Sequence, residues 1–274
     1  ARTPDDTILI SLNDAVRSMA TADRLQQLAA GRLAAAREAQ AAADARRKAD
    51  AQEYWNASPM SWPRVAAELD LQLEPDAIIV PELDYRSPFY WLDLDRGKKR
   101  LIGQTTGFAL GWGIGAALGV KIAQPDRQVV CMVGDGALLF GQIEALWTAA
   151  RYEIPVLIVV MNNRSYDNER NRIQNNSPLL SNQDTRDLWK DVSCYLGNPL
   201  VDFAGLAKSF AIPAERAADP AGFRKALKRA VAVTREGRPY LIDAMLMQLD
   251  RRGVRTEQTW HPQISIAASR TRKV

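Results

Sequence analysis

Cysteine and histidine are scarce in this 274-residue sequence, which has two cysteines and one histidine. Cys131 lies within an apolar run and Cys194 in a polar region, so a disulfide framework is not expected. The one histidine, His261, lies near the C-terminus. An acid–base mechanism that uses a pair of histidines is therefore excluded for this chain.

Long apolar runs and nucleotide-binding loops are also absent. No run approaches the length of a membrane span, and the first residues contain no apolar signal core. There is no P-loop, and the glycines of residues 103–119 do not complete G-x-G-x-x-G, which argues against a kinase and a dinucleotide site. The net charge of +4 is modest and lies largely near the chain ends, as expected of solvated surface. We predict a cytoplasmic protein with no membrane and no nucleic acid among its partners.

Composition divides the chain into three parts. Residues 13–55 are rich in Ala, Arg, Glu and Gln, which predicts one long helix, continuous or broken near Gly31. Its apolar face is thin after Leu33, so a connecting helix is favoured over a coiled coil. The proline-containing stretch 58–63 marks a boundary. We assign residues 1–57 to a connecting part, 58–248 to the main domain and 249–274 to a basic, mostly irregular tail.

Helical and apolar segments alternate along the main domain. Ser61 and Pro63 mark the start of a helix that runs to about Leu71. The alternation predicts an α/β fold with an open, mainly parallel sheet and helices on both faces. Buried strands are expected at 77–80, 129–133, 156–161 and 240–246, and helices at 140–151, 201–210 and 221–236. The glycines of residues 103–119 suit a further helix that ends at Pro125, and a long polar loop is expected at 164–199.

Polar residues follow two neighbouring apolar runs of the main domain. Gly134-Asp135-Gly136 ends the first run, and Asn162-Asn163 ends the second. Parallel strands bring their C-terminal ends to one edge of the sheet, where open α/β sheets bind ligands. Glycines at a helix start form an anion site, and carboxylate and amide oxygens suit Mg²⁺ or Ca²⁺. The pattern predicts a metal-bridged diphosphate, although Gly-Asp-Gly alone also occurs in plain structural turns.

The spacing of these motifs is more specific than either motif alone. Gly-Asp-Gly, 25 further residues and Asn-Asn resemble the thiamine diphosphate (ThDP) motif of the pyruvate decarboxylase and acetolactate synthase superfamily. The resemblance covers about residues 58–245, the diphosphate-binding domain of such enzymes. It implies ThDP and Mg²⁺ as cofactors, with Asp135, Asn163 and the main-chain carbonyl of Ser165 as metal ligands. It also implies that Gly134, Gly136 and Ala137 hold the diphosphate, with Ala137 standing where family members often have a serine.

Further residues acquire roles from the same resemblance. The segment that begins at Gly111 resembles the family's G-F-G-L-P-A-A, so Leu110 is expected to hold the cofactor in its bent form. The backbone near Phe108 would contact the pyrimidine. The stretch from Glu82 to Tyr85, which includes Asp84, falls where other members contact the diphosphate, with ordinary loop carboxylates as the alternative for Glu82 and Asp84. Tyr166 and Glu169 are candidates for contact with the substrate, with solvated loop residues as the alternative.

One component of such enzymes has no counterpart in this sequence. In the superfamily, a glutamate on a separate pyrimidine-binding domain, usually of another subunit, activates the cofactor. Residues 1–57 resemble only the end of a middle domain and its connecting helix. The resemblance therefore implies a partner chain that carries the pyrimidine and middle domains, as a separate subunit or a cleaved N-terminal part. A dimer or tetramer of such pairs is expected.

The expected reaction follows from the same family. A C–C bond lyase or carboligase is implied, which decarboxylates a small 2-oxo acid with or without acyloin-type ligation to an acceptor. A lyase of 2-hydroxyacyl thioesters is an alternative, and a non-catalytic ThDP-binding regulatory subunit is another.

Overall fold

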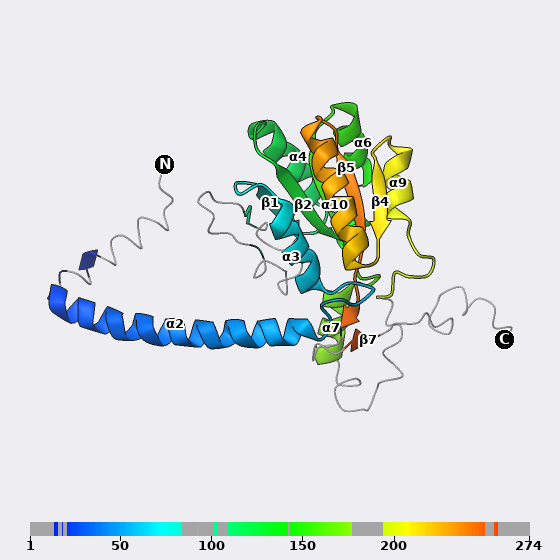
Figure 1. The fold of residues 1–274 in the computed structure, drawn as a ribbon. Helices are drawn as coiled ribbons and strands as arrows, with labels where there is room; N and C mark the ends of the chain where they lie inside the picture. Colours follow the sequence, from blue (N-terminus) through cyan, green and yellow to red (C-terminus); the bar gives the residue numbers. More distant parts are fainter. Residues whose placement is uncertain are drawn as a thin grey trace. The chain divides into compact units, whose positions relative to one another are not determined.

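A computed structural model gives the fold of the chain (Figure 1). It describes residues 14–15, 18, 21–83, 92, 101–103, 109–141, 143–176, 194–249 and 255–256. By its internal contacts the chain separates into two compact units, Ala1–Glu53 and Tyr54–Val274. None of the helices in the described ranges is both long enough and apolar enough to cross a membrane.

The first unit contains one long helix, α2 (Ala22–Gln52). Thr21 caps its start, because the threonine hydroxyl accepts a hydrogen bond from the backbone N–H of Arg24. Alanine and long unbranched side chains favour this conformation throughout. The helix continues through Gly31, so the break considered there does not occur.

The second unit is built on a five-stranded parallel sheet with the order β1-β2-β3-β5-β4. All of its pairings are parallel, so the strands end at the same edge of the sheet. The strands are β1 (Ile78–Glu82), β2 (Val129–Gly134), β3 (Val156–Asn162), β4 (Ala214–Ala217) and β5 (Tyr240–Met245). This sheet confirms the predicted α/β class.

Helices cover both faces of the sheet (Figure 1). Alternate residues of each strand supply the two cores, since successive side chains point to opposite faces. On β2, Val130 and Met132 belong to one core, and Cys131 belongs to the other. The first core includes α3 (Trp62–Gln72) and α10 (Pro220–Arg235). The second includes α4 (Gly113–Ala123), α6 (Ile143–Arg151) and α9 (Phe203–Ser209).

Several segments differ from the prediction. The region expected as a polar loop after Arg164 contains helix α7 (Asp167–Asn176), in which Asp167 and Arg170 form an ion pair. A short helix, α5 (Asp135–Leu138), starts directly at the end of β2 and precedes α6. Strand β4 was not predicted. At the junction of the main domain and the basic tail, β6 (Gln248–Leu249) pairs with β7 (Arg255–Thr256).

Candidate functional site

The ends of β2 and β3 meet at one edge of the sheet. Gly134 is paired with Met161, one residue before the end of β3, and Asp135 follows as the first residue of α5. Asp135 and Asn163 are both buried, with 3% and 5% of their surfaces exposed. The backbone N–H groups of Gly136, Arg164 and Ser165 lie near the Asp135 carboxylate and act to lower its pKa. The structure therefore joins the two motifs that the sequence places 25 residues apart.

The carboxylate of Asp135 has an uncompensated oxygen. Its Oδ2 atom is buried and has no hydrogen-bond partner. Burial raises the pKa of Asp135 to about 7, although the three backbone N–H groups lower it, and the negative charge of Asp243 adds to the rise. A buried carboxylate oxygen with no partner is costly unless a cation or a donor satisfies it. A divalent cation at Oδ2 would supply that compensation.

The turn after β3 presents further oxygen donors. The Asn163 side-chain oxygen accepts a hydrogen bond of 3.0 Å from the Ser165 N–H, which leaves this sp² oxygen a second lone pair. Arg164 adopts the left-handed conformation, with φ of 58°. The side-chain amide nitrogen of Gln248 donates a hydrogen bond of 2.8 Å to the Asn163 main-chain carbonyl and so holds the turn in place. Asn163 and Ser165 are thereby held beside Asp135.

These groups fit a magnesium ion better than a transition metal. No cluster of three or more His, Cys, Asp or Glu side chains that could hold a metal occurs among the described residues. The expected ligands are the carboxylate of Asp135, the amide oxygen of Asn163 and the main-chain carbonyl of Ser165. Mg²⁺ prefers such hard oxygen donors, and it needs few of them where phosphate oxygens complete its coordination.

A buried polar network supports the turn from below. Asp243 on β5 is fully buried, and it accepts hydrogen bonds from the Asn162 amide at 2.8 Å and from Arg216 Nε at 2.7 Å. The Asn162 oxygen accepts from the Arg164 N–H at 3.2 Å. Sequence reasoning missed this network. Its signal was an aspartate within the apolar run of β5, since a charge buried in a sheet needs partners.

Tyr166 packs against the turn that starts α5. A Cβ atom added to Gly136 would lie 2.5 Å from the Tyr166 ring, so only glycine allows this approach. The ring also meets Phe140 edge-on, with 5.6 Å between the centroids. Burial, and then the nearby charge of Asp135, raises the pKa of the Tyr166 hydroxyl. Tyr166 therefore borders the turn that is expected to hold the diphosphate, and its contact with substrate stays a prediction.

Glu82, at the end of β1, holds the start of α4. Its buried carboxylate accepts hydrogen bonds from the N–H groups of Gly111 at 2.5 Å, Gly113 at 2.6 Å and Trp112 at 3.2 Å. The helix has no side-chain cap of its own at Trp112. Leu110, which directly precedes these residues, is 51% exposed. The segment that is expected to shape the cofactor is thus attached to the end of β1.

The remaining predicted residues fall into two groups. Glu169 lies on the exposed side of α7 and pairs with Arg172 at 3.3 Å, which matches the solvated alternative, and its contact with substrate stays a prediction. Gly134 and Ala137 flank Asp135 and Gly136 at the turn, and Ala137 is buried. Asp84, Tyr85, Phe108 and His261 lie outside the described residues.

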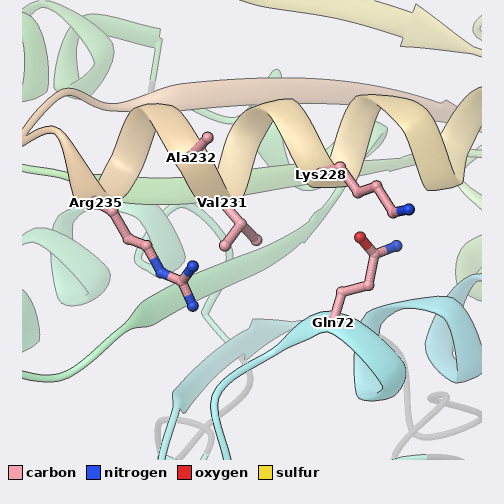
Figure 2. Close-up of a pocket in the computed structure, with 5 residues that line it drawn as sticks. All are labelled: Gln72, Lys228, Val231, Ala232 and Arg235. Atoms are coloured by element: carbon pink, nitrogen blue, oxygen red, sulfur yellow. The ribbon is translucent and has the colours of Figure 1, made fainter.

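A surface hollow of about 240 Å³ lies elsewhere, between α3 and α10 (Figure 2). It is lined by Gln72, Lys228, Val231, Ala232 and Arg235. Gln72 ends α3 and Arg235 ends α10, and each helix leads into a strand start. The hollow is therefore at the edge of the sheet opposite Asp135 and forms no part of the candidate site.

Comparison with known proteins identifies the family. Residues 90–244 match the family described as thiamine pyrophosphate enzyme, C-terminal TPP binding domain, thiamine pyrophosphate being another name for ThDP. The benzoylformate decarboxylase of Pseudomonas aeruginosa is 31% identical over 175 residues, which cover 64% of this chain and 30% of that protein. The acetolactate synthase large subunit of Parasynechococcus marenigrum is 31% identical over 172 residues, or 62% of this chain and 25% of that protein.

A solved structure supports the same assignment. The ThDP-dependent 4-hydroxybenzoylformate decarboxylase of Rhodococcus jostii RHA1 superposes with a TM-score of 0.58 at 29% identity, covering 69% of this chain and 33% of that one. This chain spans a third or less of the length of each of these three relatives. The family match covers more than half of the chain. The chain belongs to the ThDP-dependent enzyme family, of which it carries the C-terminal cofactor-binding domain.

Proposed function

We propose that this chain is the ThDP- and Mg²⁺-binding part of a C–C bond lyase or carboligase that acts on a 2-oxo acid. One observation carries the proposal: the buried carboxylate of Asp135, with Oδ2 unpartnered, lies against the turn formed by Asn163 and Ser165. A metal bound there would bridge this edge of the sheet to a diphosphate. Gly136 and Ala137 would then offer backbone N–H groups to the phosphate oxygens.

The residues of the chain bind and orient rather than transfer protons. When bound, ThDP supplies an electron sink for the cleavage of the bond next to a carbonyl. Asp135 and Asn163 fix the diphosphate end, and Leu110 would shape the other end through apolar contact. The Tyr166 ring covers the backbone of Gly136 and would limit access of water to the phosphates. Orientation of this kind lowers the barrier by holding the reacting atoms together.

The substrate class rests on the relatives. Benzoylformate and 4-hydroxybenzoylformate, in the names of two of them, are 2-oxo acids with an aromatic group. The acetolactate synthase is named for a ligation product. Decarboxylation of a small 2-oxo acid, with or without ligation, is therefore the reaction proposed for this site.

The cofactor-activating glutamate is proposed to come from a pyrimidine-binding domain outside residues 1–274. The support is that this chain matches only a third or less of each relative's length. That domain would lie on a partner chain or on an N-terminal part of the same protein. A dimer or tetramer of such pairs in the cytoplasm is the corresponding assembly.

Calorimetry of the complete enzyme tests the proposal. ThDP is titrated into the protein, together with the chain or segment that carries the pyrimidine domain, in Mg²⁺ and in excess chelator. Binding should require Mg²⁺ and should fall at least about a hundredfold in Asp135→Asn, since a charged ligand is lost. Asp126→Asn, an exposed aspartate in the turn after α4, is the matched control and should bind normally.

A decarboxylation assay then distinguishes the reaction. Release of CO₂ from benzoylformate or pyruvate is the expected result. ThDP binding without turnover of any 2-oxo acid would indicate a thioester lyase or a regulatory subunit instead. Absence of Mg²⁺-dependent ThDP binding by the wild-type enzyme would overturn the proposal altogether.

A further inference from the structure

We infer that Glu82 is a positioning residue for the bound cofactor. It would act through the segment from Leu110 to Gly113, which its carboxylate attaches to the end of β1. The inference rests on the proposed ThDP site and assigns it a residue that does not itself contact the ligand. The expected consequence is specific: Glu82 sets the affinity for complete ThDP, and not the affinity for its diphosphate end.

The contacts of Glu82 are unusual for a carboxylate at a strand end. Both of its oxygens are occupied by backbone N–H groups of one short segment, Oε1 by Gly111 and Oε2 by Trp112 and Gly113. Only 3% of the residue is exposed. Hydrogen bonds from N–H groups to a buried carboxylate are about twice as strong as neutral ones. Glu82 therefore fixes the position of three consecutive peptide groups.

The segment is shaped to fit this carboxylate. Gly111 has φ of 92°, a conformation that side chains other than glycine rarely adopt. A Cβ atom on Gly113 would lie 2.8 Å from both Cβ and Oε2 of Glu82. Two glycines thus allow the backbone to reach the carboxylate. Their spacing explains part of the glycine-rich pattern that no dinucleotide motif accounts for.

Leu110 depends on this attachment for its position. Half of its surface is exposed, so packing within the described chain holds its side chain only weakly. The backbone that follows it is fixed by Glu82. The end of β1 also lies close to Gly134, the residue before Asp135. A Cβ atom on Gly134 would lie 4.0 Å from the Glu82 carbonyl oxygen. Glu82 therefore fixes the position of the segment from Leu110 to Gly113 relative to the turn that starts at Gly134.

A comparison of two ligands tests the inference. The complete enzyme in Mg²⁺ is titrated with ThDP and, separately, with inorganic pyrophosphate, which can occupy only the diphosphate end. In Glu82→Gln, ThDP affinity should fall about tenfold or more, because one or more charge-assisted hydrogen bonds are lost. Pyrophosphate affinity should stay within about twofold of the wild type. Asp219→Asn is the matched control and should change neither affinity.

The control has the same chemistry at a different place. Asp219 caps α10 by accepting a hydrogen bond of 2.9 Å from the Gly222 N–H, as Glu82 caps α4. It follows β4, which lies four strand positions from β1, or about 19 Å at the usual strand spacing. A general effect of removing a capping charge at a helix start would therefore appear in both variants. A loss of ThDP affinity in Glu82→Gln alone would not be such an effect.

A double-mutant cycle keeps the test decisive if Glu82→Gln folds poorly. Leu110→Ala, at a half-exposed position, should reproduce the ThDP-specific loss without lowering the thermal midpoint. If Glu82 acts through Leu110, the double variant should bind ThDP no more weakly than the worse single variant. Additive losses, or equal losses for ThDP and pyrophosphate, would overturn the role of Glu82. A wild-type enzyme that binds neither ligand would instead overturn the proposed function, and this inference with it.

Discussion

Replacement of Asp243 by alanine removes the acceptor that supports the metal-binding turn. Two hydrogen bonds are lost, one from the Asn162 amide at 2.8 Å and one from Arg216 Nε at 2.7 Å. Asn162 is buried, and a buried donor left without a partner costs about 1–3 kcal/mol. The Arg216 side chain is 33% exposed and can turn to water, so its share is about 1 kcal/mol or less. The free energy of unfolding should therefore fall by about 1–4 kcal/mol.

The same change should weaken the binding of Mg²⁺. Asn162 accepts the Arg164 N–H, and Arg164 lies between the expected ligands Asn163 and Ser165. Loss of a partner behind metal ligands typically lowers metal affinity by about 10- to 100-fold. Urea denaturation measures the stability, and titration of Mg²⁺ in the presence of ThDP measures the affinity.

A matched variant separates the two halves of the network. Arg216→Met removes only the partly exposed partner of Asp243, and it should lose less stability and retain Mg²⁺ affinity within about threefold. The reasoning is refuted if Asp243→Ala costs no more than Arg216→Met. It is equally refuted if Asp243→Ala loses stability while its Mg²⁺ affinity is unchanged.

Three further predictions concern other parts of the fold. Gly136→Ala places a Cβ atom 2.5 Å from the Tyr166 ring, so urea denaturation should show a loss of about 1–3 kcal/mol, part of which Tyr166→Ala should restore in the double variant. The guanidinium of Arg224 holds the pKa of Glu68 below its usual range, so this pair stabilises the fold above the ordinary glutamate pKa and ceases to do so as the pH falls through the lowered one. The stability difference between wild type and Glu68→Gln should shrink along that acid range, and a difference that does not vary with pH would contradict this. Burial raises the pKa of the Cys131 thiol, so a thiol reagent in mildly alkaline buffer should modify Cys131 only after urea unfolds the protein.

The elements that the sequence predicted best are those with an apolar signal. β2 and β3 are continuous apolar runs, and they form as predicted to within one residue at each end. β4 consists of Ala-Glu-Arg-Ala and lies at the edge of the sheet, where it has a neighbouring strand on one side only. Its charged side chains form ion pairs with residues elsewhere in the sequence; Glu215, for example, pairs with Arg229. A pattern of hydrophobicity could not reveal such a strand.

Helix α7 was missed for a related reason. Its ten residues are almost all polar, so no apolar stripe marks it. Arg170 is nonetheless 2% exposed and pairs with Asp167 at 2.5 Å. The burial of a charged pair depends on the surrounding fold, which single-sequence periodicity does not contain. The same limit applies to Glu82, whose three N–H partners lie 29 to 31 residues further along the chain.

The two halves of the candidate site share one structural solution. A buried carboxylate on a strand holds a backbone segment of the candidate site in each half: Glu82 on β1 does so directly, and Asp243 on β5 does so through the Asn162 side chain. In both cases the held segment includes a residue with positive φ, a conformation that glycine adopts readily at Gly111 and that is strained at Arg164. Residues that are expected to face the ligand, such as Leu110, can then vary in size while the backbone stays fixed. We therefore expect substitutions at Leu110 to alter cofactor affinity with little change in stability, and substitutions at Asp243 to alter both together.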